Sequence, residues 1–169
     1  MRRKQWHTNL KDIRMLVWRI CKQKRVGDAF SGIGAEQHGG RWNHKGDRMV
    51  YTSTSLSLAT LELFIHLQPN ELPDDLYAVA ATIPDAAASE VLSIADLPKN
   101  WRDYPAPASL QDVGSAWLRE QRSFVLIVPS AVNPEEKNIL LNPLHPEAAT
   151  ISDIRSQPFH FDPRMWKVP

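Results

Sequence analysis

The sequence predicts a mixed α/β (α+β) fold, and two observations carry that prediction. Short apolar runs rich in β-forming residues, at 76–83 and 123–128, are each bounded by a proline, which is typical of strands in a sheet core. A longer segment, 56–67, repeats apolar residues at helical spacing and predicts a helix. Strands and helices follow one another without an internal repeat, which fits a mixed architecture.

Length and composition predict one compact domain spanning residues 1–169. The chain is 43% hydrophobic, which is enough to form a core. Its only cysteine, Cys21, rules out an internal disulfide and favours a reducing compartment, so we expect a cytoplasmic protein. No segment approaches the roughly 20 consecutive apolar residues of a membrane span. We therefore expect no membrane association.

The charge is unevenly distributed along the chain. Residues 1–25 contain nine lysines and arginines and one acid, whereas residues 26–169 contain eleven bases and eighteen acids. We expect a basic N-terminal extension, about residues 1–14, which is either solvated or a contact for an acidic partner. The net charge of +1 does not fit a dedicated nucleic-acid-binding domain, so direct nucleic-acid binding is not expected.

The first third of the chain predicts two strands separated by a loop. Residues 15–21 are apolar and rich in strand formers, with Arg19 as a charged residue that breaks the pattern. Residues 27–46 contain six of the seven glycines, which predicts a shaped loop without a regular element. Residues 49–52 form the second predicted strand.

The helix predicted over 56–67 follows a run of hydroxyl residues, 53–55, that can cap its first turn. Apolar side chains cover much of its circumference, so we expect it to be largely buried, and Pro69 ends it. Further along, 112–120 predicts a short helix. Residues 133–166 predict loops with one or two edge strands.

Common catalytic and metal-binding motifs are missing from the sequence. There is no HExxH, no GxSxG, no Walker loop and no cysteine pair for zinc. The histidines do not fall at metal-ligand spacing, so we predict no metal site and no resident cofactor. They are His7, His38, His44, His66, His145 and His160.

The segment from Gly39 to Glu62 combines residue types that suit a phosphate-containing ligand. Two glycines allow close approach of the backbone, Arg41 supplies a planar guanidinium, and Trp42 offers a stacking face. Tyr51 ends a predicted strand, and Glu62 lies about two turns into the predicted helix.

Each of these residues also has a purely structural interpretation. Arg41 can bind a carboxylate and brace the loop, Tyr51 can be an ordinary core residue, and Glu62 can be an exposed residue facing His66 one turn later. Their combination makes a phosphate-binding pocket the more specific hypothesis.

Several blocks of the sequence resemble the RES domain family in order and spacing. They are WRI at 18–20, the loop motifs FSGIGA and GGRWN, then VYTSTSLSLATLE, VPSAV, NILLNPLHP and FDPRMW. The resemblance covers nearly the whole chain and implies an ADP-ribosyltransferase-like fold with a small central β-sheet and flanking helices. It also implies a bacterial toxin that degrades NAD+ by cleaving the nicotinamide–ribose bond.

The family takes its name from an arginine, a glutamate and a serine. The matching positions here are Arg41, Glu62 and Ser130, which the resemblance makes the catalytic set, although Ser123 lies near enough in sequence to compete with Ser130. The residues implied to bind substrate are Arg19, Tyr51, Trp42 and Asn43.

The resemblance further implies an Xre-type helix-turn-helix antitoxin that occludes the active site, and a toxin homodimer within the complex. It leaves the acceptor of the ADP-ribosyl group open: water gives an NAD+ glycohydrolase, inorganic phosphate as co-substrate gives an NAD+ phosphorylase, and a macromolecule gives ADP-ribosylation. Two other hypotheses remain. One is an RNA-cleaving toxin that uses His38, His44 and Lys45, and the other is a binding module without catalysis.

Overall fold

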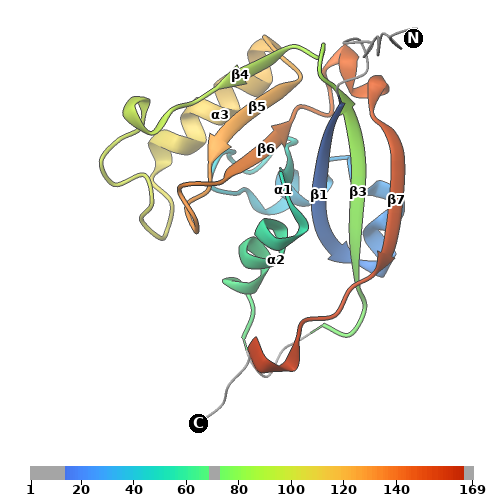
Figure 1. The fold of residues 1–169 in the computed structure, drawn as a ribbon. Coiled ribbons are helices and arrows are strands. Elements are labelled where there is room, and N and C mark those ends of the chain that lie inside the picture. The colour runs from blue at the N-terminus through green and yellow to red at the C-terminus, as the bar shows by residue number, and fades with distance from the viewer. Residues whose placement is uncertain (1–13, 69–72, 166–169) are drawn as a thin grey trace, which may run out of the picture.

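The computed structural model describes residues 14–68 and 73–165, so the predicted basic extension of about residues 1–14 lies almost entirely outside the described part. Within these residues, seven strands form one sheet in the order β4-β5-β6-β2-β1-β3-β7 (Figure 1). Their bounds are β1 Arg14–Lys22, β2 Val50–Ser53, β3 Leu76–Pro84, β4 Ser89–Val91, β5 Val125–Pro129, β6 Lys137–Leu141 and β7 Ser152–Pro158.

The sheet divides into two strand groups, β4-β5-β6-β2 and β1-β3-β7, which are joined at one position. β1 and β3 pair along nine residues, from Arg14↔Pro84 to Lys22↔Leu76, and β2 pairs with β6 along its full length. Between β1 and β2 the register contains a single Cα pair, Trp18↔Ser53. In Figure 1, β1, β3 and β7 accordingly run apart from β4, β5 and β6, with α1 and α2 between the two groups.

In the described part of the chain, three α-helices accompany the sheet: α1 Ile33–His38, α2 Leu56–Phe64 and α3 Ala108–Glu120. α2 begins directly after β2 because the Ser55 hydroxyl accepts a hydrogen bond from the backbone N–H of Leu58 (3.0 Å), which caps the first turn. The predicted mixed fold, a central sheet with flanking helices, is confirmed.

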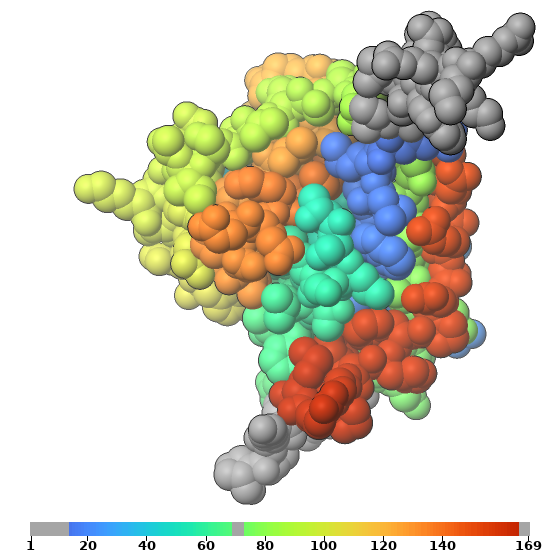
Figure 2. All heavy atoms as spheres, viewed as in Figure 1, coloured from blue at the N-terminus to red at the C-terminus, as the bar shows by residue number. Residues whose placement is uncertain are grey.

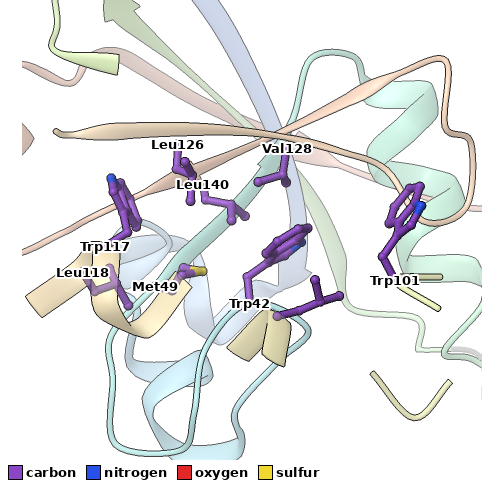
Figure 3. Packing of buried hydrophobic residues seen from close by; sticks show 9 residues of the cluster. Trp42, Met49, Trp101, Trp117, Leu118, Leu126, Val128 and Leu140 are labelled. Carbon is purple, nitrogen blue, oxygen red and sulfur yellow. The ribbon is translucent and has the colours of Figure 1, made fainter. Parts of the chain in front are cut away.

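The core lies on both faces of β5 and β6. One cluster fills the space between these strands and α3, as Figure 3 shows, while alternate residues of the same strands pack in a second cluster against β1 and β3. The first cluster consists of Trp42, Met49, Trp101, Leu110, Trp117, Leu118, Leu126, Val128 and Leu140. The second consists of Val17, Val50, Ala81, Ile83, Phe124, Val125, Ile139 and Leu141.

The glycine-rich segment 27–46 is more regular than predicted. It contains α1 and the end of a 3-10 helix, Gln23–Asp28. The glycines permit this because Gly32 and Gly39 flank α1 with φ values of 73° and 72°, a conformation that favours glycine.

The prediction that α2 is largely buried was wrong. Only Leu58 and Ala59 are buried, and Ile65, just beyond the helix, is 54% exposed. Figure 2 shows α2 at the surface, flanked by β1 and by the C-terminal part of the described chain. The helix also ends at Phe64, three residues earlier than predicted, and α3 begins four residues earlier than predicted.

The region predicted to hold loops and edge strands contains one interior strand. β6 lies between β5 and β2, whereas β7 is a true edge strand. β4, a three-residue edge strand that pairs in parallel with β5, was not predicted. In the ranges 14–68 and 73–165, no helix is long and apolar enough to cross a membrane.

Gly114 fixes how closely α3 approaches the glycine-rich segment. A Cβ atom at this position would stand 1.9 Å from the backbone carbonyl oxygen of Trp42, which cannot move without displacing the loop. We predict that Gly114→Ala lowers the free energy of unfolding by about 3 kcal/mol, the upper end for overpacking, as measured by chemical denaturation. Gly34→Ala is the matched control, because it is also helical and has no neighbour within 4 Å. Equal stability of the two variants would contradict the close contact.

Candidate active site

A cavity of about 870 Å³ opens where the two strand groups diverge. Its walls come from β1, β2, α1, α2 and the ends of β5 and β6, so residues far apart in sequence meet there. Most of the predicted site residues line it: Arg19, Arg41, Trp42, Tyr51 and Glu62.

Glu62 projects from α2 toward the ends of β5 and β6. Its Oε1 accepts two hydrogen bonds, one from the Ser130 hydroxyl (2.7 Å) and one from Nδ2 of Asn138 (2.5 Å). The Ser53 hydroxyl in turn donates to Oδ1 of Asn138 (2.7 Å). Hydrogen bonds to an ionised acceptor are the stronger kind, so the carboxylate is held firmly at the cavity wall.

The structure brings Ser130, rather than Ser123, to Glu62. Ser130 is fully buried behind the carboxylate, where its Oγ also accepts from the backbone N–H groups of Val132 and Asn133. Its hydroxyl therefore orients Glu62 and the β5–β6 loop. Ser123 lies at the other end of β5, where its hydroxyl accepts from the indole of Trp117 and donates to Glu90.

Arg41 supplies positive charge on the same cavity. Its Nη1 donates to the carbonyl oxygen of Trp101 (2.6 Å), which holds the guanidinium in place. Burial lowers the pKa of Arg41, while the negative charge of Glu62 acts in the opposite direction, so the two groups are close enough to interact. An arginine stays protonated under such conditions, and its remaining N–H donors can bind an anion.

Arg19 adds a second guanidinium from β1. Its Nη1 donates to the carbonyl oxygen of Ala29. Its Nε is buried, and in the described part of the chain it has no hydrogen-bond partner. Burial also lowers the pKa of this arginine. Unpaired buried donors are uncommon in folded proteins, so this atom distinguishes Arg19 from an ordinary strand residue.

Tyr51 organises the loop that carries Arg41. Its hydroxyl accepts from the backbone N–H of Trp42 (3.0 Å) and donates to Oδ1 of Asn43 (2.7 Å). Burial raises the pKa of the Tyr51 phenol, so it remains a donor throughout the neutral range. Gly40 is needed beside it, because a Cβ atom there would lie 2.5 Å from the hydroxyl.

The predicted stacking role of Trp42 needs correction. Its indole is 2% exposed and packs in the cluster beneath β5 and β6, as Figure 3 shows, so it has no free ring face. Asn43 is fully buried, and its Nδ2 donates to three backbone carbonyl oxygens, those of Ala35, His44 and Asp47. Both residues support the loop.

Ser53 and Asn138 belong to the site but were not predicted from the sequence. Both occur in blocks that carried the family resemblance, TSTS and NILLNP, but neither motif shows that they meet. The pairing of β2 with β6 brings them together, since Ser53 and Asn138 are direct partners in the register. In the part of the chain that the structure describes, no group of three or more His, Cys, Asp or Glu residues is placed to hold a metal ion.

The arrangement suits a ligand that carries both anionic and cationic groups. Two arginines can bind phosphate oxygens, while the fixed carboxylate of Glu62 can stabilise positive charge.

We predict that Tyr51→Phe lowers the free energy of unfolding by about 1–3 kcal/mol, because the N–H of Trp42 and Oδ1 of Asn43 lose their buried partner. Thermal and chemical unfolding measure this loss. Tyr77→Phe on β3 is a matched control from another part of the sheet. Unchanged stability of Tyr51→Phe would show that the hydroxyl does not hold the loop.

Comparison with known proteins identifies the family. The model of the RES domain matches residues 16–162. "Toxin Res" of Yersinia enterocolitica is 40% identical over 152 residues, which cover 89% of this chain and 99% of that protein. "Prs ADP-ribosylating toxin" of Sphingobium is 41% identical over 152 residues, covering 88% of this chain and 94% of that protein.

A solved structure has the same fold. The Mycobacterium tuberculosis MbcT–MbcA toxin–antitoxin complex contains a chain that matches with a TM-score of 0.70 and 20% identity, covering 87% of this chain and 85% of that one. The match of the family model over most of the sequence shows that this chain belongs to the RES domain family.

Proposed function

We propose that the protein is a toxin that consumes NAD+ by cleaving the bond between nicotinamide and ribose. The observation that carries the proposal is the fixed carboxylate of Glu62 in a cavity that also presents Arg19 and Arg41. The relatives named as toxins support the biological role.

The charge demands of this reaction match the cavity. Nicotinamide leaves as a neutral molecule that takes the bonding electron pair, and the ribose develops the positive charge of an oxocarbenium ion. A preorganised carboxylate next to the ribose stabilises that charge, and in a water-poor site such a contact contributes roughly 3–4 kcal/mol. Glu62 has this role. Oxygen from the acceptor then bonds to the anomeric carbon, and the acceptor loses a proton.

The two arginines are assigned to the pyrophosphate. Each keeps free N–H donors on the cavity, and bidentate hydrogen bonds to phosphate oxygens fix the ribose relative to Glu62. The cavity of about 870 Å³ is large enough for a dinucleotide. No resident cofactor takes part in this scheme.

The acceptor distinguishes three forms of the reaction. Water gives hydrolysis, inorganic phosphate as co-substrate gives phosphorolysis, and a macromolecule gives ADP-ribosylation. The name of the Sphingobium relative favours the third form as the alternative.

RNA cleavage has less support from the structure. His38 lines the cavity, but His44 and Lys45 do not, and the ring of His44 instead contacts Asp112 of α3 (2.7 Å).

An antitoxin partner is part of the proposal. The structural neighbour was solved as a toxin–antitoxin complex, which supports a protein that binds this chain. An Xre-type antitoxin that covers the cavity, a toxin homodimer and action in the bacterial cytoplasm complete the proposal.

One experiment tests the reaction and its carboxylate together. Purified protein is incubated with NAD+, with and without inorganic phosphate, and the products are identified by mass. We predict release of nicotinamide, and a kcat about 10²–10³-fold lower in Glu62→Gln, with the Kd for NAD+ nearly unchanged. Glu136→Gln is the matched control, because Glu136 also accepts from an asparagine amide but lies outside the cavity lining.

The products distinguish the alternatives. ADP-ribose indicates hydrolysis, ADP-ribose 1-phosphate indicates phosphorolysis, and a protein that gains the ADP-ribosyl mass indicates transfer. Full turnover in Glu62→Gln would remove the catalytic assignment. Absence of nicotinamide release from the wild-type protein would overturn the proposed function.

We predict that Arg41→Ala raises KM and lowers kcat, because the guanidinium both binds the pyrophosphate and fixes the ribose. Arg41→Lys keeps the charge but loses the planar fork, so it is expected to have intermediate activity. Arg48→Ala serves as the control, since Arg48 pairs with Glu36 and does not line the cavity. Steady-state kinetics with NAD+ measure all three variants, and a normal KM in Arg41→Ala would contradict the binding role.

A further inference from the structure

We propose that Asn138, supported by Ser53, is a positioning residue that determines which carboxylate oxygen of Glu62 faces the substrate. The inference rests on the proposed function for its kinetic consequence, but its structural consequence can be measured independently. It is carried by the chain of hydrogen bonds from Ser53 to Asn138 to Glu62.

The sheet register places the two supporting residues opposite each other. Ser53 and Asn138 are direct Cα partners on the antiparallel strands β2 and β6, so their side chains project from the same face. Ser53 is buried and Asn138 is partly buried, and both residues contribute to the cavity wall. Asn138 therefore lies between Ser53 and the carboxylate of Glu62 along this wall.

The donors and acceptors in this series of hydrogen bonds can be assigned in only one way. An ionised carboxylate only accepts hydrogen bonds, so the amide nitrogen of Asn138 must face Glu62. The amide oxygen then faces Ser53, whose hydroxyl must donate. Ser53 thus prevents the amide from turning its oxygen toward the carboxylate.

Both donors to Glu62 bind the same oxygen. Ser130 and Asn138 donate to Oε1, and among the residues that the structure describes no hydrogen bond to Oε2 is found. This arrangement fixes the rotation of the carboxylate and keeps Oε2 available to the substrate. Fixing the side chain in advance also removes the entropy cost of ordering it in each turnover.

Glu62 needs such support because its helix supplies little. α2 has nine residues, and only Leu58 and Ala59 are buried, so the helix itself is weakly anchored to the core. Ser130 also accepts from two backbone N–H groups of its loop, so its replacement would disturb that loop. Asn138 is therefore the cleaner position for a test.

The test compares Asn138→Ala and Asn138→Asp in nicotinamide release from NAD+. We expect Asn138→Ala to lower kcat about 10- to 100-fold with little change in KM, the loss expected for one hydrogen bond to a charged group. Asn138→Asp should be more damaging although it has nearly the same shape, because it places a negative oxygen against Oε1. If Asn138 had only a packing role, Asn138→Asp would instead keep a higher kcat than Asn138→Ala. Ser53→Ala should cause a smaller loss in kcat.

Matched controls come from the same strands and loop. Asn133→Ala removes an asparagine donor to another glutamate, Glu136, and Thr54→Ala removes a hydroxyl next to Ser53. Both should retain nearly the wild-type kcat. If Asn138→Ala matches these controls, if its loss appears in KM alone, or if Asn138→Asp is the milder variant, the inference is overturned.

Crystal structures of wild-type protein and Asn138→Ala provide a readout that does not depend on activity. We expect the Glu62 carboxylate to rotate or to occupy several positions in the variant, with α2 unchanged. An unmoved carboxylate overturns the inference even if NAD+ proves not to be the substrate. If the wild-type protein releases no nicotinamide, the proposed function is overturned. The position of the Glu62 carboxylate in the Asn138→Ala structure then still tests whether Asn138 orients it.

Discussion

The single Cα pair between β1 and β2, Trp18↔Ser53, is the constraint on which the rest of the structure depends. A continuous ladder at this point would close the sheet, because paired strands lie only about 4.8 Å apart. With one pair, the strand groups remain connected but diverge, and the cavity forms between them. The same pair belongs to the site, since Trp18 lines the cavity and Ser53 holds Asn138.

The short connection from β2 to α2 places the helix at the point where the two strand groups separate. β2 ends at Ser53 and Ser55 already caps the helix, so α2 starts beside the point where the strands diverge. Glu62 lies two turns along and reaches the ends of β5 and β6. A long, fully buried helix would place the carboxylate inside the core. The exposed, weakly anchored helix instead leaves Glu62 at the cavity wall, where side chains from the other strands orient it.

The sequence predicted the elements better than their contacts. The segment from Gly39 to Glu62 predicted residues that now lie around the cavity, because the glycines, Arg41 and Glu62 can be recognised from residue type and spacing alone. The burial of Trp42 could not be predicted, since it depends on α3 approaching at Gly114, 72 residues away. Asn138 was not predicted for a similar reason: residues 133–166 predict one or two edge strands, but only the register with β2 shows which residue faces Ser53.

Two partly buried arginines are the reason why the proposed function assigns a ligand with phosphate groups to this cavity. Burial lowers the pKa of both Arg19 and Arg41, which means that each guanidinium has lost part of its hydration. Backbone carbonyl oxygens compensate only in part, and Nε of Arg19 has no partner among the described residues. Glu62 cannot neutralise both, because one carboxylate carries a single negative charge and the two guanidinium groups carry two positive charges. Under the proposed function, the pyrophosphate adds acceptors and negative charge for the parts of both guanidinium groups that line the cavity.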